Sequence, residues 1–448
     1  MKYLQKSKKE KTFPLLGIVG LSHLGIVWSA AFAIKGFHIV GFDIDSETVD
    51  NLNKGIVTIP EPGIQEIFDR HRDQLFFSTD PNCIKDCSIV IFAKDMPYNE
   101  AGVIDEKIIN NLLKKIFPTL SNDTEFIFMC QVPVGFTRKI FHKINKYHFN
   151  RNISLTYCLQ TLTIGTTMEW FNNPDRIVFG LANIQRKPSK RLINTYKHFN
   201  CPLEFVSYES AELTKAAISL SLACSVTFIN TISDICEKLG ADINDIVKVM
   251  KLDKRFSPLG YWRPGLGFAG GHLERDLNTL KELSKKNDLE PELIKTIIDN
   301  SKNRYNWLVD IIENNILNKN AKPRICIWGL AYKKGTDSLH NAHCLRVIRD
   351  FSARAELTAF DPWAVLPNNY KKVKQFQNKI EALRNADCVI ILTEWEEFSI
   401  NQPNTFDVMR KKIIIDCVNI IGPKIRTYQD INYFGMGIPH HSISTNRK

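Results

Sequence analysis

A glycine-rich stretch that runs into titratable residues, Pro264–Leu280, contains the strongest candidates for chemistry in this sequence. Its glycines are Gly265, Gly267, Gly270 and Gly271. They allow positive φ angles and let the backbone approach a ligand closely. An imidazole, two carboxylates and a guanidinium follow directly, at His272, Glu274, Arg275 and Asp276. The pattern predicts a substrate loop leading onto an amphipathic helix. From these residues alone, a flexible linker is the alternative.

The composition is that of a globular protein with free thiols. Its 448 residues suffice for two or three domains, and 44% of them are hydrophobic. No apolar run reaches the roughly 18 residues of a membrane span, and the basic N-terminus lacks a signal-peptide core, so we expect a cytoplasmic protein. The 11 cysteines are scattered without a CxxC pair, which favours reduced thiols over disulfides or zinc. We expect no metal site, including at His440 and His441.

The chain is basic, with a formal net charge of +11 and a pI of about 9.0. Lysines and arginines are spread along the sequence, and no basic motif with interleaved aromatic residues indicates nucleic-acid binding. A basic surplus equally attracts a small polyanion such as a nucleotide. We therefore expect a small anionic ligand and no nucleic-acid partner.

A strand, a glycine turn, a helix, a second strand and an acid follow one another near the N-terminus, which is the pattern of a dinucleotide-binding fold. The strands are expected at Leu15–Val19 and His38–Phe42, and Asp43 lies 23 residues after Gly20. In this fold the acid holds the ribose hydroxyls, so Asp43 favours NAD over its 2′-phosphorylated form. Ser22 replaces the middle glycine, and its Cβ crowds the pyrophosphate. The predicted cofactor-binding residues are Gly20, Ser22, His23, Leu24, Gly25 and Asp43.

Strands and helices go on alternating, which argues for a mainly parallel, doubly wound sheet. Further elements are expected at Cys87–Ala93, Glu106–Phe117 (a helix), Thr124–Cys130, Ile153–Leu159 and Arg176–Gly180. A second α/β unit begins at Arg324–Leu330, with strands at Glu356–Phe360, Cys388–Thr393 and Ile413–Cys417. Its first turn has too few glycines for a second dinucleotide site and suits the nucleotide part of a substrate better.

Two long helices are expected between these α/β units, at Ser210–Leu239 and Pro291–Leu317. The first contains Lys215 in an otherwise apolar run. This lysine either extends from the helix edge to solvent or points into a cleft with a shifted pKa. Together the helices predict a helical middle domain.

The chain resembles the UDP-glucose/GDP-mannose dehydrogenase family over roughly residues 14 to 420. The resemblance rests on many motifs in one order: GIVGLSHLG, GFDID, IPEPG (59–63), VPVGFT (132–137), SAELTKAA, PGLGFAGG, GLAYKKGTDS (329–338), FDPWA (360–364) and ADCVIILTEWEEF (386–398). It implies an N-terminal Rossmann-type NAD domain over residues 1–205, a central helical dimerisation domain over 206–318, and a C-terminal Rossmann-like nucleotide-sugar domain over 319–448. It also implies a homodimer, UDP-sugar substrates and a role in polysaccharide biosynthesis.

Members of that family oxidise a sugar C6 alcohol to an acid in two hydride transfers, through a cysteine thiohemiacetal and a thioester. The aligned positions in this chain depart from that machinery. His272 stands at the nucleophilic cysteine, and an imidazole forms no stable thioester. Two glutamate positions hold Gln160 and Ile164, neither of which is a general base. The remaining departures are Gln131 for a threonine, Ser219 for an asparagine and His340 for a substrate-binding arginine.

Other family positions are kept. Lys215 matches the lysine that stabilises alkoxide and oxyanion charge, and Asp276 matches the aspartate that works with water beside the cysteine. The resemblance therefore implies catalytic roles around His272, Lys215, Asp276, Gln131 and Gln160. It implies substrate contacts from Lys215, Ser219, Gly265, Phe268, Gly270, Gly271, Lys333 and His340.

Three functions are consistent with this pattern. In the first, one hydride passes from a nucleotide-sugar carbinol to NAD, with His272 or Lys215 as proton acceptor, and the product is a carbonyl or, after return of the hydride, an epimer. In the second, the protein is a C6 dehydrogenase that forms a uronic acid through a hydrated aldehyde. The third is a non-catalytic nucleotide-sugar-binding homologue, which Ser22 favours.

Overall fold

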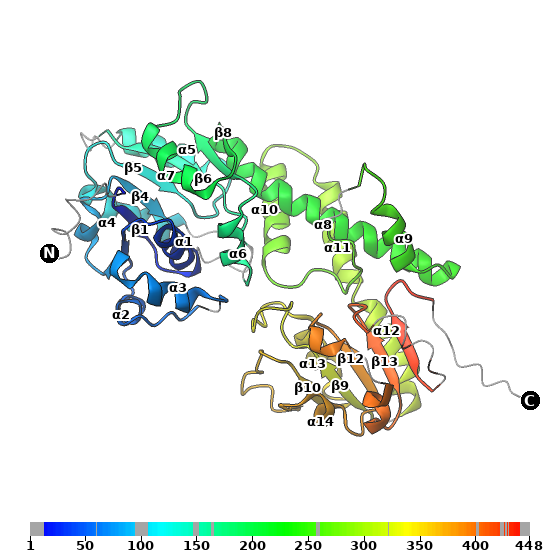
Figure 1. Ribbon diagram of the computed structural model, residues 1–448. Helices are drawn as coiled ribbons and strands as arrows, with labels where there is room; N and C mark the ends of the chain where they lie inside the picture. Colours follow the sequence, from blue (N-terminus) through cyan, green and yellow to red (C-terminus); the bar gives the residue numbers. More distant parts are fainter. Residues whose placement is uncertain are drawn as a thin grey trace, which may run out of the picture. The chain divides into compact units, whose positions relative to one another are not determined.

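The computed structural model describes residues 13–59, 61–94, 106–146, 152–162, 165–256, 260–320, 322–399, 403–421, 425, 428 and 430–439. The chain divides into two compact units, Met1–Ala217 and Ile218–Lys448 (Figure 1). Each unit contains one β-sheet. His440, His441 and Ile164 lie outside the described residues.

The sheet of the first unit has the strand order β3-β2-β1-β4-β5-β6-β7-β8. The strands are β1 (Leu16–Val19), β2 (Ile39–Phe42), β3 (Leu75–Ser78), β4 (Ile89–Phe92), β5 (Glu125–Phe128), β6 (Ser154–Cys158), β7 (Ile177–Leu181) and β8 (Leu203–Ser207). All neighbours are parallel except β6 and β7, which pair antiparallel. The chain order reverses between β1 and β4, where ligands bind in such sheets. The predicted doubly wound α/β fold is confirmed.

Helices cover the strands of the first unit. They are α1 (His23–Ile34), α2 (Ser46–Lys54), α3 (Ile64–Arg70), α4 (Glu106–Ile116), α5 (Phe136–Lys146), α6 (Thr167–Asn172) and α7 (Lys190–Tyr196). Alternate residues of β4 fall into two separate apolar clusters: Ile89 and Ile91 pack with Trp28, and Val90 and Phe92 with α4 and α5 residues. Both faces of the sheet are therefore buried, as a parallel sheet requires.

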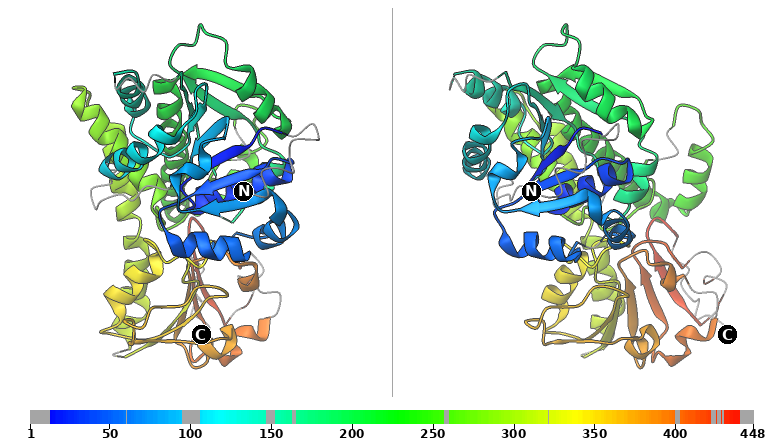
Figure 2. Two further views of the ribbon diagram at one scale, coloured as in Figure 1. Left: turned by 90° about the vertical axis from the view of Figure 1, so that its left-hand side faces the viewer. Right: turned by 60° about the vertical axis from the view of Figure 1, so that its left-hand side comes forward.

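The sheet of the second unit has the order β11-β10-β9-β12-β13-β14, all parallel. Its strands lie in the part of the ribbon coloured from yellow-green to red in Figure 2. Its strands are β9 (Arg324–Trp328), β10 (Glu356–Phe360), β11 (Val373–Gln375), β12 (Cys388–Ile391), β13 (Ile413–Asp416) and β14 (Asn432–Gly435). The helices of this unit are α9 (Ile243–Met250), α10 (His272–Lys286), α11 (Glu292–Asn303), α12 (Asn306–Asn315), α13 (His343–Phe351) and α14 (Lys379–Leu383).

The predicted long helix over Ser210–Leu239 is present as α8 (Tyr208–Leu239). The single helix predicted over Pro291–Leu317 is wrong, because α11 ends at Asn303 and α12 begins at Asn306. Between them the backbone tightens to i→i−3 hydrogen bonds, from the Trp307 N–H to the Arg304 carbonyl and from the Leu308 N–H to the Tyr305 carbonyl.

Helix α8 is long and apolar enough to cross a membrane by length and composition, with a mean hydropathy of 1.5 over 18 residues. No such stretch was expected from the sequence. A single helix of this kind is weak support for a membrane span, because the core helices of soluble proteins pass the same test.

Candidate functional site

The turn after β1 requires its glycines. Gly20 has φ +93°, and a Cβ built there would lie 2.6 Å from Cβ of Lys94. A Cβ on Gly25 would lie 1.8 Å from the Gly20 carbonyl oxygen. Ser22 precedes α1 with φ −76°, which a serine adopts without strain. The serine is therefore compatible with the turn itself.

The acid after β2 is anchored beside this turn. Asp43 is 3% exposed, and its carboxylate accepts hydrogen bonds from the Leu21 N–H at 2.7 Å and the Asp45 N–H at 3.1 Å. Lys94 Nζ lies 2.8 Å from Asp43 Oδ2. Lys94 was not among the predicted site residues, although its place after β4, the strand next to β1 in a doubly wound sheet, is a signal that it lines the turn.

The second unit repeats this backbone arrangement at Gly329 and Asp361. The Gly329 N–H donates to the Phe360 carbonyl as the Gly20 N–H does to the Phe42 carbonyl. Asp361, however, accepts from five groups: the N–H groups of Leu330, Ala331, Trp363 and Ala364, and the Trp395 indole. These donors occupy the carboxylate, whereas Asp43 keeps acceptor capacity for ribose hydroxyls. The glycine turn and Asp43 therefore fit a dinucleotide in the first unit.

His23, the first residue of α1, connects the dinucleotide turn to a distant loop. Its Nε2 lies 3.1 Å from Oε2 of Glu61, which is 6% exposed. Glu61 also accepts hydrogen bonds from the Gly165 N–H at 3.0 Å and the Thr167 N–H at 2.7 Å. One buried carboxylate thus joins the start of α1 to the start of α6.

Gln160 stands at one of the family's glutamate positions, and its side chain makes hydrogen bonds within the first unit. Its Oε1 accepts a hydrogen bond from the Trp28 indole at 3.0 Å, and its Nε2 donates to the Leu159 carbonyl. Trp28 belongs to the aromatic core beneath α1. This geometry gives Gln160 a structural role in the first unit. Gln131 lies after β5 and is half-buried.

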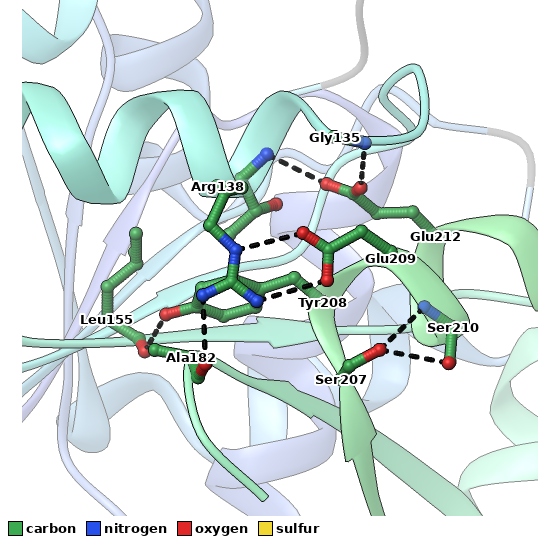
Figure 3. Close-up of polar contacts among 10 residues, drawn as sticks. Gly135, Arg138, Leu155, Ala182, Ser207, Tyr208, Glu209, Ser210 and Glu212 are labelled. Carbon is green, nitrogen blue, oxygen red and sulfur yellow. Dashed lines mark hydrogen bonds and ion pairs between the residues drawn. The ribbon is translucent and has the colours of Figure 1, made fainter.

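The beginning of α8 is docked on the loop that follows Gln131 (Figure 3). Glu212 is 2% exposed and accepts from the Gly135 N–H at 2.6 Å and the Thr137 N–H at 2.8 Å. Burial raises the pKa of Glu212. Arg138 reaches both carboxylate oxygens of Glu209, at 2.9 and 3.0 Å, and its hydrogen bond lowers the pKa of that glutamate. Lys215 lies on α8 one turn after Glu212 and is half-buried.

The predicted substrate loop in the second unit is an ordered, packed segment. The Gly265 N–H donates to Asn230 of α8 at 2.9 Å, and the Phe268 N–H donates to Ser301 of α11 at 2.7 Å. A Cβ on Gly267 would lie 2.2 Å from the Ser301 carbonyl oxygen, so the glycine permits this approach. The flexible-linker alternative does not describe this segment.

A chain of polar contacts runs from α8 to the end of this loop. The Ser219 hydroxyl donates to Asp276 Oδ2 at 2.6 Å, and Arg275 Nε lies 3.2 Å from Asp276 Oδ1. Arg275 Nη2 then lies 3.1 Å from Nδ1 of His272, which is exposed. A guanidinium only donates, so Nδ1 accepts and Nε2 carries the imidazole proton. Arg275 therefore stands between His272 and Asp276.

The segment after β9 packs on the same loop. A Cβ on Gly271 would lie 2.7 Å from Nε2 of His340, and one on Gly270 would lie 2.8 Å from the Tyr332 ring. Asn341 donates to the Gly270 carbonyl at 3.0 Å. Lys333 Nζ lies 5.7 Å from the centre of the Tyr332 ring. The structure thus brings His340 beside the loop that ends at His272.

The cysteines are all buried or partly buried, and ten of them have a raised pKa that makes them poor nucleophiles. Burial raises the pKa of Cys83, Cys326 and Cys344 to about 12 and also raises the pKa of seven others, Cys87, Cys158, Cys201, Cys224, Cys236, Cys388 and Cys417. Cys130 is 1% exposed. None of the 11 lies in the stretch from Pro264 to Leu280. Among the residues that the structure describes, no group of three or more His, Cys, Asp or Glu is placed to hold a metal ion.

A cavity of about 700 Å³ lies elsewhere in the second unit, along α13. It shares only Asn341 with the contacts around the glycine loop. Its basic lining residues are Arg346, Arg349, Lys371 and Lys372.

Three family models match the chain in order. They are the NAD binding domain of the UDP-glucose/GDP-mannose dehydrogenase family at residues 15–200, its central domain at 209–303 and its UDP binding domain at 326–423. The UDP-glucose 6-dehydrogenase YwqF of Bacillus subtilis is 27% identical over 430 residues, which cover 94% of this chain and 97% of that protein. The UDP-glucose 6-dehydrogenase of Rickettsia typhi is 28% identical over 437 residues, covering 94% and 98%.

Among solved structures, a UDP-glucose dehydrogenase from Pyrobaculum islandicum matches with a TM-score of 0.85 at 23% identity, covering 96% of this chain and 99% of that chain. The fold and the glycine turn define a dinucleotide-binding protein. The chain belongs to the UDP-glucose/GDP-mannose dehydrogenase family, whose members are NAD-dependent nucleotide-sugar dehydrogenases, and its cofactor is NAD. The predictions of family, fold class and cofactor are confirmed.

Proposed function

We propose that this protein oxidises one CH–OH group of a nucleotide sugar, in the first instance a UDP-sugar, by a single hydride transfer without thioester chemistry. Its UDP binding domain and the names of its relatives support the substrate class. NAD, when bound, accepts the hydride from the carbinol carbon. The proposed product is a carbonyl.

The observation that carries this proposal is the imidazole of His272 where the family resemblance expects a thiolate. No cysteine lies in the glycine loop, and ten of the chain's 11 thiols have a pKa raised by burial. A thiol with a raised pKa carries little thiolate at neutral pH, so it does not capture an aldehyde efficiently. The second oxidation therefore lacks its covalent route.

The contacts of His272 indicate its role. Because Arg275 occupies Nδ1, Nε2–H is a hydrogen-bond donor that holds the substrate oxygen and stabilises negative charge on it. The proton of the carbinol then passes to Lys215 in its neutral form. Asp276 and Ser219 fix the guanidinium of Arg275 and are positioning residues.

The remaining predicted residues complete the proposal. Gly265, Phe268, Gly270, Gly271, Lys333 and His340 contact the nucleotide sugar, and Gly20, Ser22, His23, Leu24, Gly25 and Asp43 contact NAD. Gln131 lies next to the reacting groups. Gln160 stabilises the loop after β6 through its hydrogen bond with Trp28. We also propose domain boundaries at 205/206 and 318/319, a homodimer and a cytoplasmic location.

A product screen tests this function. The protein is incubated with NAD and a panel of UDP-, GDP- and dTDP-sugars, and the mass and stereochemistry of each sugar are recorded with the NADH formed. Loss of two hydrogens matched by NADH is the expected result. An acid, an isomer of unchanged mass, or binding without turnover would each contradict it, pointing to a C6 dehydrogenase, an epimerase and a binding protein respectively.

A further inference from the structure

Lys94 places a positive charge directly on the acid of the cofactor site. It follows β4, the strand beside β1 in the sheet. Its Nζ lies 2.8 Å from Asp43 Oδ2, and the two side chains are 27% and 3% exposed. The pair is thus shielded on the aspartate side and open to solvent on the lysine side.

The backbone of Lys94 is part of the wall of the glycine turn. A Cβ built on Gly20 would lie within 2.6 to 2.8 Å of Cβ, Cα and N of Lys94. In the second unit the same place against Gly329 is taken by Thr393, whose hydroxyl donates to the Ala331 carbonyl at 2.6 Å. A short neutral side chain therefore satisfies this architecture, and the fold does not require the charge of Lys94.

The charge matters for discrimination between dinucleotides. An acid at the end of β2 holds the ribose 2′-hydroxyl and repels a 2′-phosphate. A cation 2.8 Å from that carboxylate cancels most of its field, and two of the three ammonium protons remain as donors beyond the one on Asp43. We propose that Lys94 is a specificity-determining residue of the cofactor site, which admits the 2′-phosphorylated dinucleotide, NADP, alongside NAD.

The test measures cofactor binding by titration calorimetry on the full chain, without substrate or turnover. The wild type is expected to bind NADP with a Kd within roughly tenfold of its Kd for NAD. Lys94→Met is expected to raise the ratio of the Kd for NADP to the Kd for NAD at least tenfold, because the charge of Asp43 is then no longer offset and repels the 2′-phosphate. Lys94→Arg, which keeps the charge, and Lys85→Met, which removes an exposed charge from the same domain, are expected to leave the ratio within about threefold of the wild type.

Three results would overturn the proposal: a wild type that binds NAD but not NADP, a ratio unchanged in Lys94→Met, or an equal change in Lys85→Met. Thermal unfolding of each variant checks that it is folded. Since the readout is binding, it does not depend on whether the reaction is a single hydride transfer.

Discussion

At the level of residues, the imidazole of His272 has one nitrogen occupied by a cation. Arg275 Nη2 at 3.1 Å fixes Nδ1 as an acceptor, and Arg275 is itself held by Asp276. A neutral histidine held in this way donates from Nε2, which differs from the general base that its sequence position alone favoured. With Nε2 as a donor, Lys215 is the proposed proton acceptor.

Removal of the imidazole donor tests this role. His272→Ala is expected to lower kcat about 100-fold, as loss of an oxyanion donor does. His272→Gln, which keeps an N–H donor, is expected to retain a larger share of the activity. Steady-state kinetics with the substrate found in the screen measure both, and His142→Ala, an exposed histidine, is the control. Equal losses in the Ala and Gln variants would argue against donation.

At the level of elements, α8 is attached to the loop after β5 by a buried carboxylate. Glu212 accepts two backbone N–H groups, and burial raises its pKa. An amide in its place accepts through one oxygen only, so at least one buried N–H is left unpaired. Lys215 lies one turn further along α8, so the same contact helps to hold the proposed proton acceptor.

Glu212→Gln is therefore expected to destabilise the protein by about 1–3 kcal/mol. Glu209→Gln, which breaks the more exposed pair with Arg138, is the matched control and is expected to cost less than about 1 kcal/mol. Thermal unfolding of both variants at pH 7 measures the difference. The same loss in both variants would contradict a special role for the buried carboxylate.

His343, the first residue of α13, is expected to make the stability of the folded protein sensitive to acid. Burial and the charge of Arg346 lower the pKa of His343 from 6.5 to about 4. Between these values the unfolded chain takes up a proton that the folded chain does not, so the contribution of His343 to stability falls as the pH drops from 6.5 toward 4 and does not change above that window. In His343→Leu this loss is expected to be absent. Unfolding temperatures at pH 7, 5.5 and 4.5 compare the two, and parallel curves would refute the assignment.

Much of this organisation was predictable from periodicity and turns. The strand–turn–helix pattern from Leu15 to Asp43 located the dinucleotide turn, because its glycines and acid are local in sequence. The contacts of Lys94 with Asp43 and of Arg275 with His272 were not predictable, since side-chain direction depends on packing between elements. The break at Arg304 was missed because no proline or glycine marks it.

At the level of the whole molecule, exposed apolar side chains on α8 and α9 support the proposed homodimer. The exposed fractions are 43% for Phe228, 48% for Ile235, 77% for Leu239 and 66% for Val249. Large apolar side chains gathered on a surface indicate an interaction site.

The native mass in solution is expected to be twice the 51.4 kDa of the chain. A Phe228→Glu, Leu239→Glu double variant is expected to shift toward the monomer, because two charges would be buried in the interface. Light scattering after size exclusion measures both masses. Ile184→Glu, which charges an exposed apolar residue of the first unit, is the control. A wild type that is monomeric at all concentrations would exclude the dimer.

The central claim, a single oxidation at a site without a thiolate, is tested most directly by stoichiometry. The substrate identified in the screen is supplied at limiting concentration. The moles of NADH formed per mole of sugar consumed are measured, and the mass of the product is determined by mass spectrometry. One NADH per sugar and a product lighter by two hydrogens are expected. Two NADH per sugar, with a uronic acid as product, would contradict it.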